Sequence, residues 1–186
     1  MSNLLVQNIK HTNGTTAQTV DSSGRVHHPN TTFCDLWRLN ADFNSSDATI
    51  TGWVRPSESY AAYIAPSNTG MSVSSGIFTF PITGVYLVTV HSQCFLSSAD
   101  QHAGLNLQVS TDTGGSFDIA ARTSSATEAA SNSMTGSGLQ FLMNVSNIST
   151  TQVKFVTVSF SSGAYIMGNS GENHTSAYFE RKGPSQ

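Results

Sequence analysis

Apolar and polar residues alternate along most of the chain, in short blocks separated by turn residues. A period of two is typical of a strand with one buried face, because successive side chains of a strand point to opposite faces of its sheet. Blocks with this pattern begin near residue 33 and recur as far as residue 182. Their spacing predicts about eight to ten strands and an all-β fold class, either a sandwich or a barrel.

The longest apolar block, residues 76–96, reads GIFTFPITGVYLVTVHSQCFL. Its first strand is expected to end at Pro81, because proline has no backbone N–H to donate to a ladder. After a turn, a long strand begins at Val85 and is apolar on both faces. From this and later blocks we expect the following side chains in or near the core: Phe78, Phe80, Tyr86, Val88, Phe155 and Phe179.

Other blocks are less regular. In residues 33–43 the apolar positions mix two periods, so a strand with a bulge and a short amphipathic turn both fit, and we favour the strand. Residues 55–75 hold two prolines, which predict a long connection with one or two edge strands. Beyond them we expect a hairpin over residues 105–122, a strand pair formed by 139–145 and 153–161, and a closing strand over 174–182.

The first thirty residues have a different pattern. Two turn sequences, Asn13-Gly14 and Asp21-Ser22-Ser23-Gly24, interrupt very short apolar steps. Asn, Asp and Gly favour tight turns because they tolerate positive backbone angles. The sequence therefore predicts a small β-meander over residues 1–31, too small to fold alone, followed by a head domain over residues 32–186. The alternative is a loosely ordered leader.

Composition narrows the function classes. Only 10% of residues are charged and the formal net charge is -3, which argues against a nucleic-acid surface. No window approaches the ~20 apolar residues of a membrane span, and the N-terminus lacks the pattern of a secretory signal. We therefore expect synthesis in the cytoplasm and no membrane partner. Cys34 and Cys94 each lie in an apolar stretch, which fits two buried free thiols better than the alternative of a disulfide.

The sequence offers little catalytic chemistry. None of the six histidines lies in a known catalytic motif, and no nucleophile motif is present. His27-His28 fits a polar linker, with metal binding on a symmetry axis as the alternative, and His91 and His102 are expected at strand ends. Residues 112–115, DTGG, predict a hairpin turn, since a calcium loop needs further carboxylates. We expect no enzyme activity, no metal and no cofactor.

The stretch GIFTFPITGVYLVTV resembles the signature G-x-F-x-x-P-x-x-G-x-Y-x-[VF] of the tumour-necrosis-factor and complement-head superfamily. The matching residues are Gly76, Phe78, Pro81, Gly84, Tyr86 and Val88. The ending SAYFERK is similar to the closing strand of that superfamily. The resemblance implies a ten-stranded jelly roll that forms homotrimers, and strands such as VYLVTV and VKFVTV, apolar on both faces, suit a subunit contact. Cover by the chain's own loops is the alternative.

One departure from the superfamily pattern matters. The turn usually written K-G-D reads Ser149-Thr150-Thr151 in this chain. Ion-binding and receptor-binding details of the superfamily therefore do not transfer to it.

The stretch from Asn8 to Pro29 resembles short modules near the start of tail-fibre and other virion proteins of marine bacteriophages. The residues that define this docking module are Asn8, Asn13, Gly14, Asp21, Gly24 and Pro29. In such proteins a complement-type head commonly follows. The resemblance implies a virion protein, assembled in the bacterial cytoplasm, that docks on other virion proteins through residues 1–30.

Together these observations predict a non-enzymatic, trimeric knob or fibre-like component of a phage particle. No heptad repeat and almost no spacer separate the module from the head, so we expect a short knob. Contact with a host-surface glycan would use the polar loops 97–103, 123–138 and 161–173. The alternatives are a capsid decoration protein without a receptor role, a free trimeric carbohydrate-binding module, and a glycan-depolymerising spike that joins carboxylates from two chains.

Overall fold

The computed structural model describes residues 7–14, 16–27, 33–57, 70–97, 100–127, 132–158, 160 and 163–186, which form strands and turns. In this part of the chain no helix has the length and hydropathy of a membrane span. The strands are β1 (Asn8–Lys10), β2 (Thr16–Val20), β3 (Val26–His27), β4 (Phe33–Leu39), β5 (Trp53–Val54), β6 (Ser72–Ser74), β7 (Ile77–Thr79), β8 (Gly84–Leu96), β9 (Asp100–Ser110), β10 (Asp118–Thr127), β11 (Ser133–Val145), β12 (Gln152–Val158), β13 (Tyr165–Ile166) and β14 (Ser176–Gly183).

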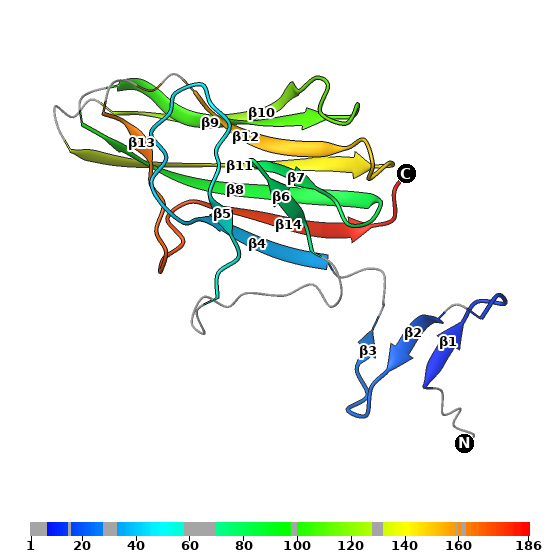
Figure 1. Ribbon diagram of the computed structural model, residues 1–186. Helices are drawn as coiled ribbons and strands as arrows, with labels where there is room; N and C mark the ends of the chain where they lie inside the picture. Colours follow the sequence, from blue (N-terminus) through cyan, green and yellow to red (C-terminus); the bar gives the residue numbers. More distant parts are fainter. Residues whose placement is uncertain are drawn as a thin grey trace.

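The strands form three antiparallel sheets (Figure 1). Strands β1, β2 and β3 make a small sheet of their own. A five-stranded sheet has the order β10-β9-β12-β7-β6, and a six-stranded sheet has the order β11-β8-β14-β4-β5, with β13 paired to β8. The two larger sheets pack face to face, which places one hydrophobic core between them.

Chain order and sheet order differ in the sandwich. Strands β9 and β10 form the hairpin expected over residues 105–122. The expected pair of 139–145 with 153–161 is wrong, because β11 pairs with β8 whereas β12 pairs with β9 and β7. A period of two shows which face of a strand is buried. It does not show which strands pair, because a strand of the facing sheet has the same alternation as a neighbour in the same sheet.

Two predicted loops are shorter than expected. Strand β9 begins at Asp100, inside the predicted loop 97–103. Strand β10 extends into the predicted loop 123–138 as far as Thr127, and strand β11 begins inside that loop at Ser133. Serine and threonine are compatible with a strand when neighbouring strands provide its backbone hydrogen bonds. Polar composition alone was therefore a poor indicator of a loop in these two segments.

The less regular blocks resolve into strands. Residues 33–39 form β4, so the strand interpretation is confirmed for them, and Phe43 makes an isolated bridge to Ile166. Of the expected connection 55–75, residues 58–69 lie outside the described part of the chain, and β6 is the edge strand that follows.

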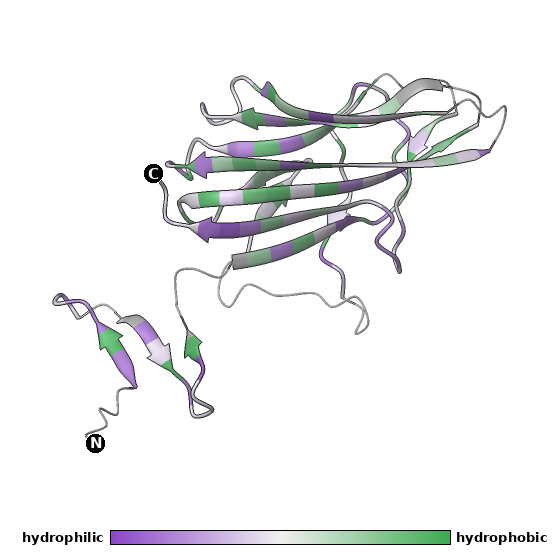
Figure 2. Cartoon of the chain, turned by 180° about the vertical axis from the view of Figure 1, so that it is seen from behind, coloured by the Kyte–Doolittle hydropathy of each residue, from purple (hydrophilic) through white to green (hydrophobic). Residues whose placement is uncertain are grey.

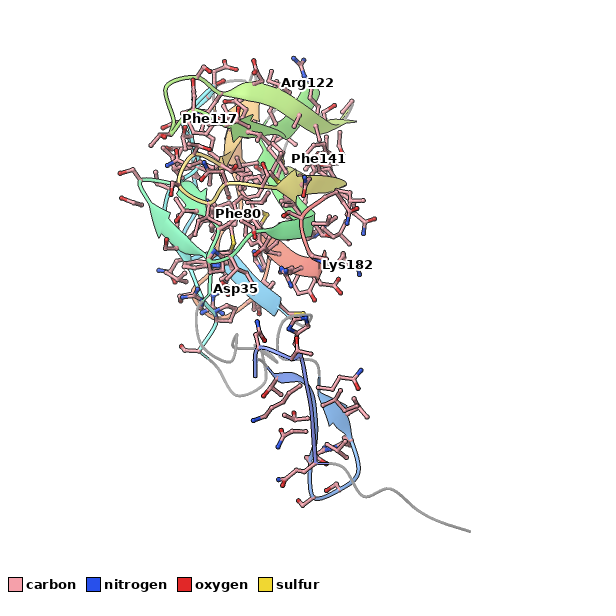
Figure 3. All side chains as sticks on the ribbon, turned by 90° about the vertical axis from the view of Figure 1, so that its right-hand side faces the viewer. Asp35, Phe80, Phe117, Arg122, Phe141 and Lys182 are labelled. Atoms are coloured by element: carbon pink, nitrogen blue, oxygen red, sulfur yellow. The ribbon has the colours of Figure 1, made fainter. Side chains whose placement is uncertain are left out.

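Aromatic side chains fill the centre of the core. Phe78 is fully buried and lies within 5.0 to 5.8 Å, between ring centroids, of four other rings. These rings belong to Trp37, Trp53, Phe155 and Phe179. Figure 3 shows Phe80 in the same interior, 4.8 Å from the ring of Tyr86. All six side chains expected in the core are buried.

The corner between β7 and β8 depends on small residues and one tyrosine. Gly76 has a φ of 80°, and a Cβ there would collide with the carbonyl oxygen of Ile50. A Cβ at Gly84 would lie 2.6 Å from the carbonyl oxygen of Gly183. The buried Tyr86 hydroxyl donates to the carbonyl of Ile82 at 2.9 Å, which fixes the corner. Burial raises the pKa of Tyr86 to about 12.

The N-terminal sheet is held by its two turns. Gly14 has a φ of 85° and donates its N–H to the carbonyl of His11 at 2.8 Å. The Asp21 carboxylate accepts from the backbone N–H groups of Ser23 and Arg25 at 2.9 and 3.0 Å, and from Arg25 Nε at 2.7 Å. These hydrogen bonds stabilise the sheet in place of a hydrophobic core, since its side chains Ile9 and Val26 are 50% and 54% exposed.

Candidate interaction surface

The outer face of the six-stranded sheet is the side turned away from the core. Strand β8 shows how it arises, because its buried residues alternate with half-buried ones, apart from the exposed His91. The half-buried set includes Val85, Leu87 and Phe95, which are as apolar as the core set. Apolar bands (green in Figure 2) are frequent along this sheet. A sheet with two apolar faces favours cover on both.

The ladder registers place apolar side chains of this outer face side by side. Leu142 of β11 lies opposite Leu87 and is 61% exposed. Met134 lies opposite Phe95 and is 60% exposed. On the other side of β8, the rings of Phe95 and Tyr165 are stacked, with centroids 4.9 Å apart and planes at 18°. Two apolar groups result, one at each end of the β8–β11 ladder.

The middle of the outer face carries a tyrosine and a thiol. The hydroxyl of Tyr178 on β14 donates to the sulfur of Cys34 on β4 at 3.0 Å. Both side chains are half-buried. Burial, with the contact to Cys34, raises the pKa of Tyr178 well above its ordinary value, so this hydroxyl stays neutral at physiological pH.

Polar groups border the outer face at one end. Lys182 Nζ lies 2.9 Å from Glu180 Oε1, and Figure 3 shows Lys182 at the end of β14. The Asn144 side chain exchanges two hydrogen bonds, 2.9 and 3.1 Å long, with the backbone of Gln186.

The outer face of the five-stranded sheet is more polar. It presents Gln108, Arg122 and Ser124, together with Lys154, whose ammonium lies 4.1 Å from the centre of the Phe117 ring. Strand β12, the VKFVTV segment, belongs to this sheet. The two strands expected to share one contact surface, VYLVTV and VKFVTV, therefore present their second faces in opposite directions.

Comparison with solved structures identifies the architecture. Eiger, a TNF from S. frugiperda, is 11% identical to this chain at a TM-score of 0.65, over 84% of this chain and 96% of that one. Murine APRIL at pH 5.0 is 12% identical at a TM-score of 0.54, over 81% and 99%. The globular domain of zebrafish complement 1qA is 12% identical at a TM-score of 0.48, over 81% and 94%.

This is a TNF-like jelly roll. The expected fold class is thereby confirmed. No protein-family model matches the chain, and no curated protein matches it in sequence.

Each residue of the superfamily signature has a structural role in the jelly roll. Phe78, Tyr86 and Val88 fill the core, while Gly76 and Gly84 allow close backbone approach. Pro81 lies between β7 and β8, where no ladder bond is needed. The signature therefore builds the corner of the fold, and none of its residues lies on the outer face of the six-stranded sheet.

A partly buried ion pair was not predicted from the sequence. Arg55 donates from Nε and Nη2 to the two oxygens of Asp35, each at 2.8 Å, and its guanidinium lies 4.2 Å from the centre of the Trp37 ring. Asp35 also accepts from the N–H of Met71 at 2.7 Å. The pair ties the segment before β6 to β4. Residues 35 and 55 are distant in sequence, so no local pattern indicated it.

The candidate metal-ligating side chains lie apart in the described part of the chain. The described residues contain no group of three or more His, Cys, Asp or Glu side chains placed to hold a metal. Cys34 and Cys94 are free thiols, as expected, but only Cys94 is buried, which raises its pKa to about 11, whereas Cys34 is half-buried. His91 is exposed in the middle of β8, so its expected place at a strand end is wrong, because β8 continues to Leu96.

Several expectations fall on other parts of the chain. Residues 112–115 form the turn between β9 and β10, where hydroxyl and backbone donors of Ser110 and Ser116 lower the pKa of Asp112 to about 2. Of the histidines, the side chains of His27 and His102, and all of His28, lie outside the described residues.

The docking-module residues share one small sheet. Asn8 begins β1, Asn13 and Gly14 form the first turn, and Asp21 and Gly24 form the second. Pro29 lies outside the described residues. Ile9 and Val26, which the sequence reasoning did not single out, are the exposed aliphatic side chains of this sheet.

Proposed function

We propose that the chain is a non-enzymatic virion component of a bacteriophage, a short homotrimeric knob docked through residues 1–30 and in contact with the host surface. The trimer is supported by one observation above all: the outer face of the six-stranded sheet carries Leu142 and Met134 at about 60% exposure, beside Leu87 and Phe95. Side chains of this size gain free energy when a neighbouring subunit covers them.

A closed trimer is supported by the placement of the apolar groups on this face. Apolar groups lie at both ends of the β8–β11 ladder, with Gly136, Gly138 and the exposed His91 between them. A heterologous contact that closes on three copies covers this face without leaving an open end, which limits the assembly to a defined size. The TNF-like fold is compatible with such an assembly.

The virion role is supported by the N-terminal sheet. Its pattern from Asn8 to Pro29 resembles phage virion modules, and its exposed Ile9 and Val26 are available to a docking partner. A sheet of ten strand residues has too little core to be stable by itself, so a partner surface or two further copies would stabilise it. A capsid decoration protein without a receptor role, or a free carbohydrate-binding trimer, are the competing functions.

Incorporation into particles tests this role. Tagged full-length chain and a variant that lacks residues 1–30 are expressed in the infected host, and purified particles are probed for each. We expect both to be trimeric and only the full-length chain to enter particles. Truncated chain in the particles would refute the docking role. The position of the knob in electron micrographs then separates host contact from decoration, since a site buried under other virion proteins would refute host contact.

A further inference from the structure

A hollow lies on the outer face of the five-stranded sheet. It has a volume of about 160 Å³ and is lined by Asn106, Arg122, Thr123, Ser124 and Val158. The lining comes from three neighbouring strands, β9, β10 and β12, with Asn106 directly opposite Arg122 in the ladder. Irregularities in the β9–β10 register, between Ile119 and Ala121 and between Ser125 and Thr127, flank the hollow on β10.

Asn106 is the unusual residue of this hollow. Its side chain is only 8% exposed, yet its Oδ1 has no hydrogen-bond partner among the described residues. Buried polar atoms are nearly always paired, because an unpaired acceptor loses its hydrogen bonds to water and gains none in return. The atom itself has almost no accessible surface, and a turn of the amide about its last bond would bring Oδ1 to the hollow, where a ligand with a hydroxyl or amide donor would satisfy it.

Arg122 supplies the second group. It is exposed, it lines the hollow, and no ion pair or hydrogen bond joins its guanidinium to another described residue. Figure 3 shows it on β10, at the outer side of the sandwich. A guanidinium presents two parallel N–H donors that match the two oxygens of one carboxylate.

Close packing of β10 on β9 fixes the distance between the two groups. A Cβ at Gly104 would lie 2.6 Å from the Cα of Ser124, so only glycine permits this approach. Gly104 is paired with both Ser124 and Val158, two of the residues that line the hollow. Ser124 adds a hydroxyl that both donates and accepts, and Val158 adds an apolar wall.

We propose that this hollow binds a carboxylated sugar residue, such as a terminal hexuronic acid. The carboxylate pairs with Arg122, a ring hydroxyl donates to Asn106 Oδ1, and the apolar face of the ring contacts Val158. A volume of about 160 Å³ suits one sugar ring. One cation matches the single charge of a carboxylate better than the double charge of a phosphate monoester. The site is complete in one chain, and it depends on the proposed function only for the origin of the glycan.

Titration of the full chain with methyl β-D-glucuronide, followed by backbone amide NMR, tests the proposal. We expect saturable shifts centred on residues 104–106 and 122–124. Methyl β-D-glucoside, which lacks the carboxylate, should bind at least about tenfold more weakly, and sodium acetate, which lacks the hydroxyls, should do the same. Equal shifts with the glucoside, equal shifts with acetate, or no saturable shifts with the glucuronide would each overturn the proposal.

Variants locate the binding. Arg122→Gln changes an exposed side chain and should weaken glucuronide binding at least about tenfold. Asn106→Leu removes the unpaired acceptor and should also weaken binding. Lys154→Gln is the matched control, since it removes a positive charge from the same sheet face but leaves the hollow intact, and should bind as the wild type does. Full binding by Arg122→Gln would contradict the assignment.

The same samples separate this inference from the trimer. The mass of the chain is measured with and without methyl β-D-glucuronide. A trimer that does not bind the sugar refutes the hollow as a sugar site and leaves the assembly intact. A monomer that binds it refutes the trimer and leaves the site.

Discussion

The two outer faces of the sandwich differ although both sheets alternate with the same period. The residues of the six-stranded sheet that point away from the core include Leu87, Phe95 and Leu142. Those of the five-stranded sheet include Gln108, Arg122 and Ser124. The core-facing sets are alike. Alternation therefore specifies the sandwich, and the residues on the other face make one outer face apolar and the other polar.

The largest effect is expected from a charge on the apolar outer face. Leu142→Glu would bury an unpaired carboxylate in each subunit contact, at a cost of about 3 kcal/mol or more per subunit. The trimer should dissociate while each chain stays folded, as size-exclusion chromatography with light scattering would show.

Ile119→Glu is the matched control for that variant. Ile119 is also an exposed aliphatic residue, at 42%, but it lies on β10 opposite Gln108, on the polar outer face. The Ile119→Glu variant should form the same oligomer as the wild type. If Ile119→Glu dissociates the trimer and Leu142→Glu does not, the roles of the two faces are reversed.

A core change should weaken both sheets together. Tyr86→Ala removes a fully buried ring that packs on Phe80 and a hydroxyl that fixes the β7–β8 corner, so unfolding should cost about 3 kcal/mol less. Tyr86→Phe keeps the ring and should lose only about 1 kcal/mol. Denaturant unfolding measures both. Near-equal losses would show that the ring contributes little to the core.

Thiol labelling distinguishes the faces without altering the fold. Cys34 lies on the apolar outer face, and Cys94 is buried with a pKa raised to about 11. Maleimide should modify Cys34 of the Leu142→Glu monomer at least about tenfold faster than Cys34 of the trimer, because cover by a subunit excludes the reagent. Cys94 should stay unmodified in both. Equal rates at Cys34 in trimer and monomer would place the subunit contact elsewhere.

The smallest effect is local and concerns the five-stranded sheet. The pKa of Asp112 falls from 3.8 to about 2 because the folded hairpin donates hydrogen bonds to its carboxylate. This contribution is present above pH 4 and is lost as the pH falls through about 2, since protonation removes the acceptor. Amide exchange at residues 110–116 should accelerate over that interval. Unchanged exchange, with Asp112→Asn as the reference, would contradict the role of the carboxylate.

The sequence predicted where strands form better than it predicted which strands pair with each other. The pattern of residues 76–96 identified the buried set of β8 and the stop at Pro81, because both are local properties. It could not place 139–145 and 153–161 in separate sheets, since pairing depends on contacts across the core. The two-faced strands indicated a subunit contact, but only the registers showed that Leu142 joins Leu87 and that β12 belongs to the other sheet.

Neither the hollow nor the Asp35–Arg55 ion pair could be predicted from the sequence, and the reason is the same for both. Asn106 and Arg122 are opposed only because β9 and β10 pair in one register, with an irregularity between Ile119 and Ala121. Asp35 and Arg55 meet through the return of the chain past Trp37. Neither residue pair has a spacing that a sequence motif would reveal.

Sedimentation equilibrium of the wild-type chain at micromolar concentration is the decisive test of whether copies of the chain cover the outer face of the six-stranded sheet. We expect a single species of close to three times the 19.7 kDa of one chain. A stable species of 19.7 kDa that does not bind a hydrophobic dye would contradict it.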